Sequence, residues 1–147
     1  KAQELFQGES VVLVHDGVRP LVDEETISKS IDMVKRKGSA ITVAPAIETI
    51  VLKSDTGMVD EIVPRDECQL AKAPQCFLLK DLYRAHQLAK NDAKKNFIDS
   101  ASLMKYYGYS LYTIEGKPEN IKITTPSDFY IFRAIIEAKE NSQIFGL

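Results

Sequence analysis

The sequence lacks the short motifs by which many enzymes are recognised. Its seven glycines are never closer than eight residues apart, so neither GxGxxG nor GxxxxGK is present as a phosphate-binding loop. There is no serine nucleophile elbow, no HExxH and no histidine pair spaced for one metal, since the only histidines are His15 and His86. Any site must therefore be assembled from residues that lie far apart in the sequence.

The sequence also lacks a large excess of one charge and long apolar runs. The 147 residues carry a formal net charge of -2, whereas nucleic-acid-binding surfaces usually have a strong basic excess, so we expect no nucleic-acid partner. No apolar stretch approaches the roughly 20 residues that span a bilayer, and the first ten residues contain no apolar signal-peptide core. Cys68 and Cys76 do not have a zinc-site spacing. We interpret them as reduced structural thiols, which predicts a cytoplasmic protein without membrane contact.

Hydrophobic patterning predicts an α/β domain with a mainly parallel sheet. The apolar run at 11–16 suits a strand covered on both faces, Asp23 is placed to cap a helix that ends at Gly38, and a strand follows over 39–46. Strand, helix and strand of these lengths form a βαβ crossover. The other expected elements are a turn at Gly8, strands over 69–79, 110–116 and 119–124, and helices over 80–90, from Asp99 and over 126–141.

Residues 46–66 interrupt this pattern. Apolar and polar side chains alternate there around the turn SDTG, which predicts a protruding β-hairpin. An isolated two-stranded hairpin is marginally stable, so we expect it to pack on another surface, with a partner subunit as one candidate. Without further context, Thr49 and Arg65 at its ends are typical of solvated residues.

Asp16 follows an apolar strand at the place where α/β sheets bind ligands. Ligands of open α/β sheets lie beyond the carboxyl ends of the strands, and a carboxylate there suits Mg²⁺, which prefers oxygen ligands. Arg19 comes three residues later, and its planar guanidinium suits phosphate or vicinal hydroxyls. The alternative is structural: Asp16 caps a turn and Arg19 is solvated.

Lys122 is a second candidate for binding an anion. It lies between Ile121 and Ile123 on a predicted strand, shortly before a helix that begins at Pro126. Helix N-termini attract anions, and a lysine beside one strengthens the attraction. The alternative is an edge-strand lysine, whose charge discourages aggregation.

Taken together, these segments resemble one enzyme family from Val11 onward. The family is that of 2-C-methyl-D-erythritol 4-phosphate cytidylyltransferase, with the closely similar ribitol-5-phosphate cytidylyltransferase. The resemblance lies in the order of HDGVRP, the Thr49 hairpin, the arginine of VPRDE, APQCF, DSASL and EGKPENIKITTPSD. It implies a Rossmann-like nucleotidyltransferase fold that joins CTP and a polyol phosphate into a CDP-polyol and pyrophosphate, with Mg²⁺ as cofactor.

The resemblance also implies a role for each candidate residue. Asp16 matches the metal-binding catalytic aspartate, and Lys122 matches the catalytic lysine that holds the substrate phosphate. Arg19 and Thr49 match residues that contact the polyol phosphate. The 46–66 hairpin matches an interlocking dimer arm, which implies a homodimer in which Arg65 reaches the substrate phosphate of the neighbouring subunit.

Two residues and one region depart from the family pattern. Ala73 and Ile98 stand where members of the methylerythritol type usually have threonines that help to hold the substrate phosphate. The family's glycine-rich, basic CTP loop precedes the HDGVRP strand, and this sequence starts one helix before that strand. We therefore expect residues 1–147 to be the C-terminal portion of a single cytidylyltransferase domain, inactive alone.

Three functions follow from the resemblance. The first, which the sequence pattern favours, is a cytidylyltransferase for 2-C-methyl-D-erythritol 4-phosphate in isoprenoid precursor synthesis. The second is a ribitol-5-phosphate cytidylyltransferase for cell-wall or capsule polymers. The third is a non-catalytic module that dimerises or binds substrate without the CTP loop.

Overall fold

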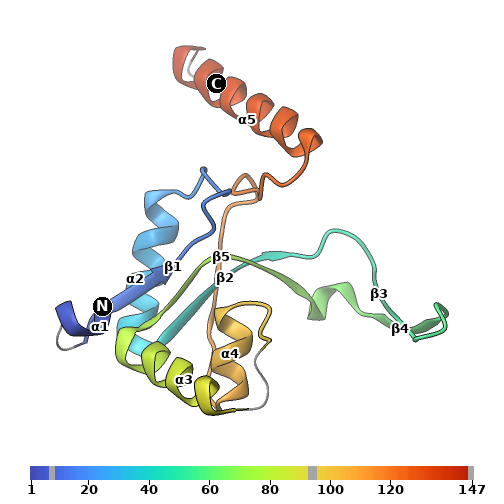
Figure 1. Ribbon diagram of the computed structural model, residues 1–147. Coiled ribbons are helices and arrows are strands. Elements are labelled where there is room, and N and C mark those ends of the chain that lie inside the picture. The colour runs from blue at the N-terminus through green and yellow to red at the C-terminus, as the bar shows by residue number, and fades with distance from the viewer. Residues whose placement is uncertain (7–8, 93–95, 146–147) are drawn as a thin grey trace.

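The computed structural model describes residues 1–6, 9–92 and 96–145 (Figure 1). The predicted turn at Gly8 lies outside the described residues. In chain order the elements are α1 (Ala2–Leu5), β1 (Val11–Val14), α2 (Glu24–Lys37), β2 (Ser39–Pro45), β3 (Ile50–Lys53), β4 (Val59–Val63), a 3-10 turn η1 (Arg65–Glu67), β5 (Gln69–Leu78), α3 (Leu79–Asn91), α4 (Ser100–Tyr106), β6 (Thr113–Glu115) and α5 (Pro126–Phe145).

The main sheet has the strand order β1-β5-β2-β6. Strands β1, β2 and β6 run in one direction, as expected for a mainly parallel α/β sheet, and β5 runs against both of its neighbours. The reversal of β5 follows from the hairpin. Pro45 at the end of β2 pairs with Gln69 at the start of β5, so the chain leaves the sheet, forms the hairpin and returns alongside the strand it left.

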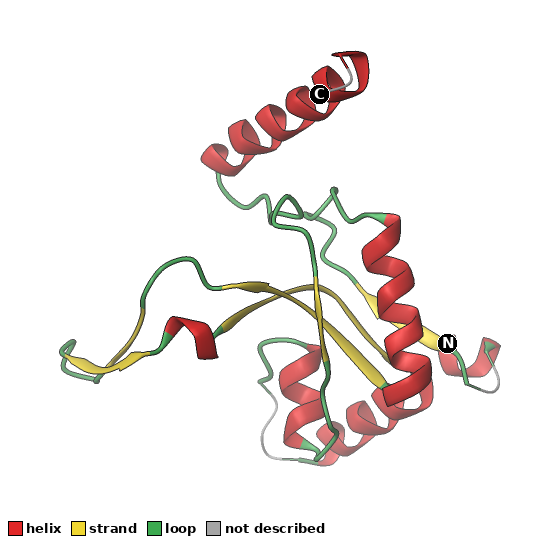
Figure 2. Ribbon diagram, turned by 180° about the vertical axis from the view of Figure 1, so that it is seen from behind, coloured by secondary structure: helices red, strands yellow, loops and turns green. Residues whose placement is uncertain are grey.

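Helices cover both faces of the sheet (Figure 2). Phe77 of β5 packs with residues of α3 and α4 in one core cluster, whereas its neighbour Cys76 packs with Val34 of α2 in the other. Successive side chains of a strand point to opposite faces, so β5 is buried on both sides. Strand β1, expected to be covered on both faces, is only half-buried because it lies at the edge of the sheet.

The sequence predicts a strand over 119–124, most of which lies in residues 116–123, here called the strap. That prediction is wrong: the segment has no regular secondary structure, because its polar groups bind to several neighbouring elements instead of one strand. Five of these contacts are Gly116 N to Val43 O, Lys117 Nζ to Asp23 Oδ2, Lys72 Nζ to Pro118 O, Asn120 Nδ2 to Ala73 O and Ile123 N to Val18 O. The strap is therefore attached to the sheet, to α2 and to the turn after β1.

Lys117 links the strap to the N-terminus of α2. Asp23 accepts from Thr26 N at 2.7 Å and caps the helix as predicted, and Lys117 Nζ lies 2.6 Å from its other oxygen. The hydrogen bonds from Lys117 and Thr26 lower the pKa of Asp23 to about 2. A pKa lower in the folded than in the unfolded chain adds stability that is complete above about pH 4 and is lost as the pH falls toward 2.

We therefore expect Lys117→Met to lower the melting temperature at neutral pH only slightly, by at most about 3 °C, because Lys117 is 54% exposed and ion pairs of exposed side chains contribute little to stability. The difference in melting temperature from the wild type should disappear as the pH approaches 2, because Asp23 then becomes protonated in the folded as well as the unfolded chain. Thermal melting of both proteins, followed by circular dichroism across this pH range, measures the gap. A gap of the same size at acidic and neutral pH would contradict the assigned ion pair.

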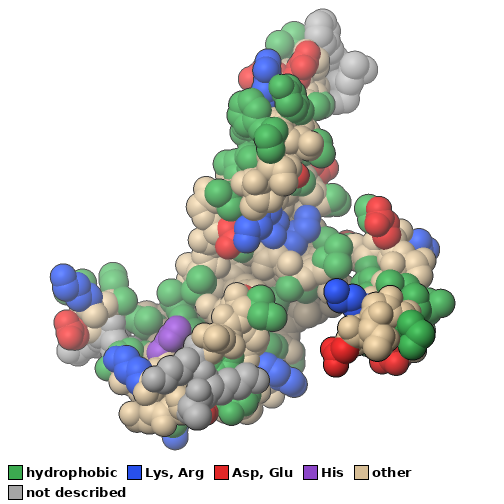
Figure 3. Space-filling view, turned by 45° about the vertical axis from the view of Figure 1, so that its right-hand side comes forward, with side chains coloured by type: hydrophobic (Ala, Val, Ile, Leu, Met, Phe, Trp, Pro, Cys, Tyr) green, Lys and Arg blue, Asp and Glu red, His purple; other side chains and the backbone are tan. Residues whose placement is uncertain are grey.

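Two elements project from the sheet and its helices. The hairpin predicted within 46–66 is formed by β3 and β4 around a turn in which Gly57 has a φ of 84°. Both the hairpin and α5 expose large apolar side chains (Figure 3). On the hairpin these are Val51, Leu52, Met58, Val59 and Ile62. None of the described helices combines the length and apolar character needed to cross a bilayer.

Candidate active site

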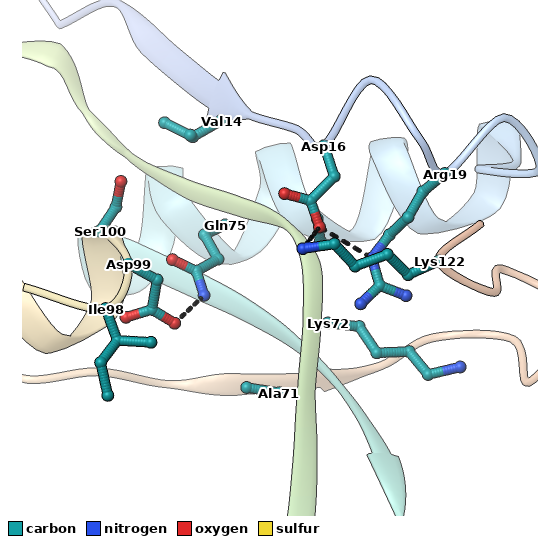
Figure 4. A pocket seen from close by; sticks show the side chains of 11 residues that line it. Val14, Asp16, Arg19, Ala71, Lys72, Gln75, Ile98, Asp99, Ser100 and Lys122 are labelled. Carbon is teal, nitrogen blue, oxygen red and sulfur yellow. Dashed lines mark hydrogen bonds and ion pairs between the residues drawn. The ribbon is translucent and has the colours of Figure 1, made fainter. Parts of the chain in front are cut away.

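A cavity of about 310 Å³ lies between the end of β1, the middle of β5, the start of α4 and the strap (Figure 4). It holds three of the five residues proposed from the sequence. Its lining consists of Val14, Asp16, Arg19, Ala71, Lys72, Ala73, Gln75, Ile98, Asp99, Ser100 and Lys122. The chain thus gathers one carboxylate and three cations on one side of the cavity and a second carboxylate on the other.

Asp16 and Arg19 are held together by the turn after β1. The backbone N–H of Arg19 donates to the carbonyl of Asp16 at 3.0 Å, and His15 Nε2 lies 2.8 Å from the carbonyl of Arg19. Arg19 Nε donates to Asp16 Oδ2 at 3.0 Å, and the Arg19 side chain is only 11% exposed. Asp16 therefore belongs to a turn, as the structural alternative expects, but Arg19 is not solvated.

Lys122 reaches the same carboxylate from the strap, 106 residues further along the chain. Its Nζ lies 3.5 Å from Asp16 Oδ2, so both cations contact one oxygen. Partial burial acts to raise the pKa of Asp16, but the hydrogen bond from Arg19 and the charge of Lys122 outweigh it and hold the pKa below its usual value. Asp16 is thus an ionised carboxylate in a positive environment.

The opposite wall is built by Gln75 and Asp99. Gln75 is buried on β5, donates through Nε2 to Asp99 Oδ2 at 2.7 Å and accepts from Ala101 N at 2.9 Å. Asp99 also caps α4 by accepting from Ser102 N at 2.8 Å. Burial acts against ionisation of Asp99, yet these hydrogen bonds lower its pKa overall. Both carboxylate oxygens of Asp99 therefore accept hydrogen bonds within the chain.

Sequence reasoning missed Gln75 and Lys72 as cavity residues. The period of two along β5 could have found Gln75, because it shares a face with Ala71 and Ala73, which also line the cavity. Nothing in the sequence indicates that Lys72 lines the cavity. Its Nζ donates to Pro118 O of the strap at 3.1 Å, a contact between residues far apart in the sequence. Burial and the nearby charge of Arg19 lower the pKa of Lys72.

Thr49 and Arg65 are not brought to this cavity within one chain. Both are exposed on the hairpin, where Arg65 Nη1 donates to Ile47 O at 3.1 Å across the hairpin's base. Arg65 instead lines a separate depression of about 520 Å³ between the end of β2 and the start of β5. Their predicted contacts with a substrate remain predictions.

Asp16 is the residue suited to hold Mg²⁺. Among the described residues no cluster of three or more His, Cys, Asp or Glu side chains could hold a metal by itself. Mg²⁺ is commonly held by one or two carboxylates, with substrate phosphates and water completing its coordination, and a single carboxylate fits that pattern. Because Arg19 and Lys122 oppose a lone cation, a metal ion held by Asp16 would need anionic ligands beside it.

Comparison with known proteins places this site in a family. A ribitol-5-phosphate cytidylyltransferase of Vibrio parahaemolyticus is 49% identical over 146 residues, covering 99% of this chain and 61% of that protein. A 2-C-methyl-D-erythritol 4-phosphate cytidylyltransferase of Halalkalibacterium halodurans is 36% identical over 132 residues, covering 90% and 57%. The structure of 4-diphosphocytidyl-2C-methyl-D-erythritol synthase from Anaerococcus prevotii matches with a TM-score of 0.80 at 28% identity, covering 86% and 58%.

The three matches cover a similar share of each relative's length. The chain spans about three fifths of the length of the relatives it resembles. The model of the family described as IspD, 2-C-methyl-D-erythritol 4-phosphate cytidylyltransferase, matches residues 2–138. The resemblance noted from the sequence is thereby confirmed, and the chain belongs to the IspD family of cytidylyltransferases.

Proposed function

We propose that the complete protein transfers the cytidylyl group of CTP to a polyol phosphate at the Asp16 cavity, in a reaction that requires Mg²⁺. The observation that carries this proposal is the meeting of Asp16, Arg19 and Lys122 in one cavity, from segments more than one hundred residues apart. Such a site suits two polyanionic substrates, because it offers cations for phosphates and one carboxylate for their metal.

In the proposed reaction a phosphate oxygen of the polyol phosphate attacks the α-phosphorus of CTP in line, and the bond to pyrophosphate breaks. The protein contributes positioning and charge neutralisation more than covalent chemistry. Lys122 orients the attacking phosphate, and Arg19 holds Asp16 in place through Nε. Mg²⁺, when bound, neutralises charge that develops on the phosphate oxygens.

Ribitol 5-phosphate is our preferred acceptor, ahead of the methylerythritol phosphate that the sequence pattern favoured. The relative named for ribitol 5-phosphate is 49% identical, against 36% for the one named for methylerythritol phosphate. The cavity wall supports this order. Ala73 and Ile98 line it in place of hydroxyl-bearing side chains, and Ile98 is 98% exposed at the rim.

Turnover of the complete protein with CTP and each acceptor tests this choice. We expect kcat/KM for ribitol 5-phosphate to exceed that for 2-C-methyl-D-erythritol 4-phosphate by at least about tenfold, the effect of one differential hydrogen bond to a charged group. A preference for methylerythritol phosphate would reverse the proposed order and leave the cytidylyltransferase proposal intact.

A homodimer through the hairpin is part of the proposal. The hairpin exposes Val51, Met58 and Ile62, and a two-stranded hairpin is marginally stable without a surface to cover it. If Arg65 acts in the neighbouring subunit's cavity, Arg65→Ala should raise KM for the polyol phosphate about tenfold. Lys53→Ala, which removes another exposed charge from the same hairpin, should leave KM unchanged.

Mixing Asp16→Asn, which should lose turnover, with Arg65→Ala, which should have a raised KM, distinguishes a partner's arginine from one acting within its own chain. A dimer of one Asp16→Asn subunit and one Arg65→Ala subunit has one doubly defective site and one intact site if the arm is exchanged. The mixture should therefore show sites with the wild-type KM for the polyol phosphate. Without exchange every site carries one defect, and a mixture with only the raised KM of Arg65→Ala would contradict the role assigned to the arm.

A non-catalytic binding module is the second candidate for residues 1–147, which span about three fifths of the relatives' length. Calorimetry of these residues with CTP and Mg²⁺ tests whether they bind the nucleotide by themselves. We expect no micromolar binding, and such binding would contradict the expectation that residues 1–147 alone are inactive. A cytoplasmic location completes the proposal, supported by the two free cysteines.

A further inference from the structure

Asn120 of the strap does not line the cavity, but it contacts two residues that do, Arg19 and Ala73. It is 3% exposed, and its side-chain Nδ2 donates to the carbonyl of Ala73 on β5 at 2.9 Å. Its own backbone carbonyl accepts from Arg19 Nη1 at 2.9 Å. One residue thus connects the central strand of the site to the arginine that follows β1.

These bonds determine where Arg19 points. Its guanidinium is held at two positions, by Asp16 Oδ2 at Nε and by the Asn120 carbonyl at Nη1. The carbonyl can hold Arg19 only while the strap stays in place, and the Asn120 side chain fixes the strap to Ala73 at that residue. Lys122 leaves the strap two residues later and reaches the same oxygen of Asp16.

The Asn120 side chain is not explained by stability alone. Its Oδ1 is buried and has no hydrogen-bond partner among the described residues. A buried polar atom without a partner destabilises a fold, so an apolar or smaller side chain would avoid this penalty. The hydrogen bond to Ala73 O requires a side chain that carries a donor at the distance of Asn120 Nδ2 from the backbone.

We propose that Asn120 is a positioning residue, which fixes the guanidinium of Arg19 and thereby the carboxylate of Asp16 for the transfer reaction. The site is then preorganised by a chain of contacts that runs from Ala73 through Asn120 and Arg19 to Asp16. Catalytic groups held by such supporting contacts lose activity when the support is removed, although no group that touches substrate has changed. The effect on activity rests on the function proposed above, whereas the effect on Arg19 does not.

Hydrogen exchange of the Arg19 Nε–H, measured by heteronuclear NMR on the complete protein without substrate, tests the geometry directly. The Arg19→Lys variant assigns the signal. In the wild type we expect exchange at least about tenfold slower than for Arg84 and Arg133, whose side chains are exposed, because a hydrogen-bonded and buried N–H is protected. Equal exchange rates for all three would overturn the proposal before any variant is made.

The variants then separate positioning from folding. Asn120→Ala should speed Arg19 exchange, and Asn120→Leu, which has a similar shape but no donor for the Ala73 carbonyl, should do the same. Lys117→Met removes another attachment of the strap outside the cavity and should leave Arg19 exchange unchanged. If Asn120→Ala does not fold, the Leu variant decides, and unaltered exchange in a folded Asn120 variant contradicts the proposal.

A double-mutant cycle on turnover supplies the functional readout. Asn120→Ala should lower kcat/KM about tenfold in the wild-type background, the size expected for one lost hydrogen bond. In an Arg19→Met background it should change kcat/KM less than about twofold, because the residue through which Asn120 acts is already absent. Additive effects would indicate a merely structural Asn120. Absence of turnover in the wild type would refute the proposed function instead, and the exchange measurement would still decide the geometry.

Discussion

Replacing Asp16 with Asn should lower Mg²⁺-dependent turnover of the complete protein by at least about 100-fold, which is typical of removing one preorganised electrostatic group. The side chain keeps its size but loses the charge that Arg19 and Lys122 both contact and on which the proposed Mg²⁺ site depends. The remaining carboxylate of the cavity, Asp99, is engaged with Gln75 and the N-terminus of α4, so it does not substitute.

The fold should survive this change. The Asp16 side chain is 38% exposed, and ion pairs at partly solvated positions contribute little to stability, about 0–1 kcal/mol. Thermal melting of Asp16→Asn should therefore be close to that of the wild type while turnover is lost. Wild-type turnover in Asp16→Asn with the same dependence on Mg²⁺ would sink the assignment of the metal ligand.

Replacing Lys122 with Met should have the second largest effect. The ammonium lies 3.5 Å from Asp16 Oδ2 on a strap attached at both ends, so it is placed before substrate arrives. We expect kcat/KM for the polyol phosphate to fall about 10- to 100-fold, because charge-assisted hydrogen bonds to phosphate are among the strongest polar contacts in proteins.

The matched control for Lys122→Met is Lys117→Met on the same strap. Both changes remove an ammonium that contacts an aspartate, but Lys117 pairs with Asp23 outside the cavity. Steady-state kinetics should show the loss only for Lys122. Equal losses in both variants would indicate that the strap's general stability, rather than a cation at the Asp16 carboxylate, determines the rate.

Much of the fold was predictable because its local signals agree with one another. Asp23 and Gly38 bound α2 as predicted, with the aspartate capping its start and the glycine adopting a φ of 89° at its end. The direction of β5 was not predictable, since an apolar strand has the same pattern whichever way it runs. It became clear only from the pairing of Pro45 with Gln69.

The strap shows where sequence reasoning fails. Ile121, Lys122 and Ile123 alternate as in a strand, but no neighbouring strand pairs with them in the described residues. The backbone N–H of Ile123 donates to Val18, and the neighbouring Asn120 is held by Ala73 and Arg19. Period-two patterning reports alternating exposure, and a well-anchored irregular segment produces the same pattern.

Part of the candidate site was predictable from the order of the sequence segments. Asp16, Arg19 and Lys122 belong to segments that the resemblance placed in order, and the fold brings them into one cavity. The period of two along β5 could have indicated Gln75 as a cavity residue. Asn120 could not be found in this way, because its side chain contacts Ala73 and its carbonyl contacts Arg19, both distant in sequence. Thr49 and Arg65 lie outside the cavity within one chain, and the mixing experiment tests the proposed action of Arg65 in a second subunit.

Product analysis of the complete protein tests the central claim most directly. Incubation with CTP, ribitol 5-phosphate and Mg²⁺, followed by phosphorus NMR, should show a new diphosphate diester and an equal amount of pyrophosphate, both lost in Asp16→Asn. Absence of pyrophosphate release with ribitol 5-phosphate and with 2-C-methyl-D-erythritol 4-phosphate would contradict a cytidylyltransferase site built on Asp16, Arg19 and Lys122.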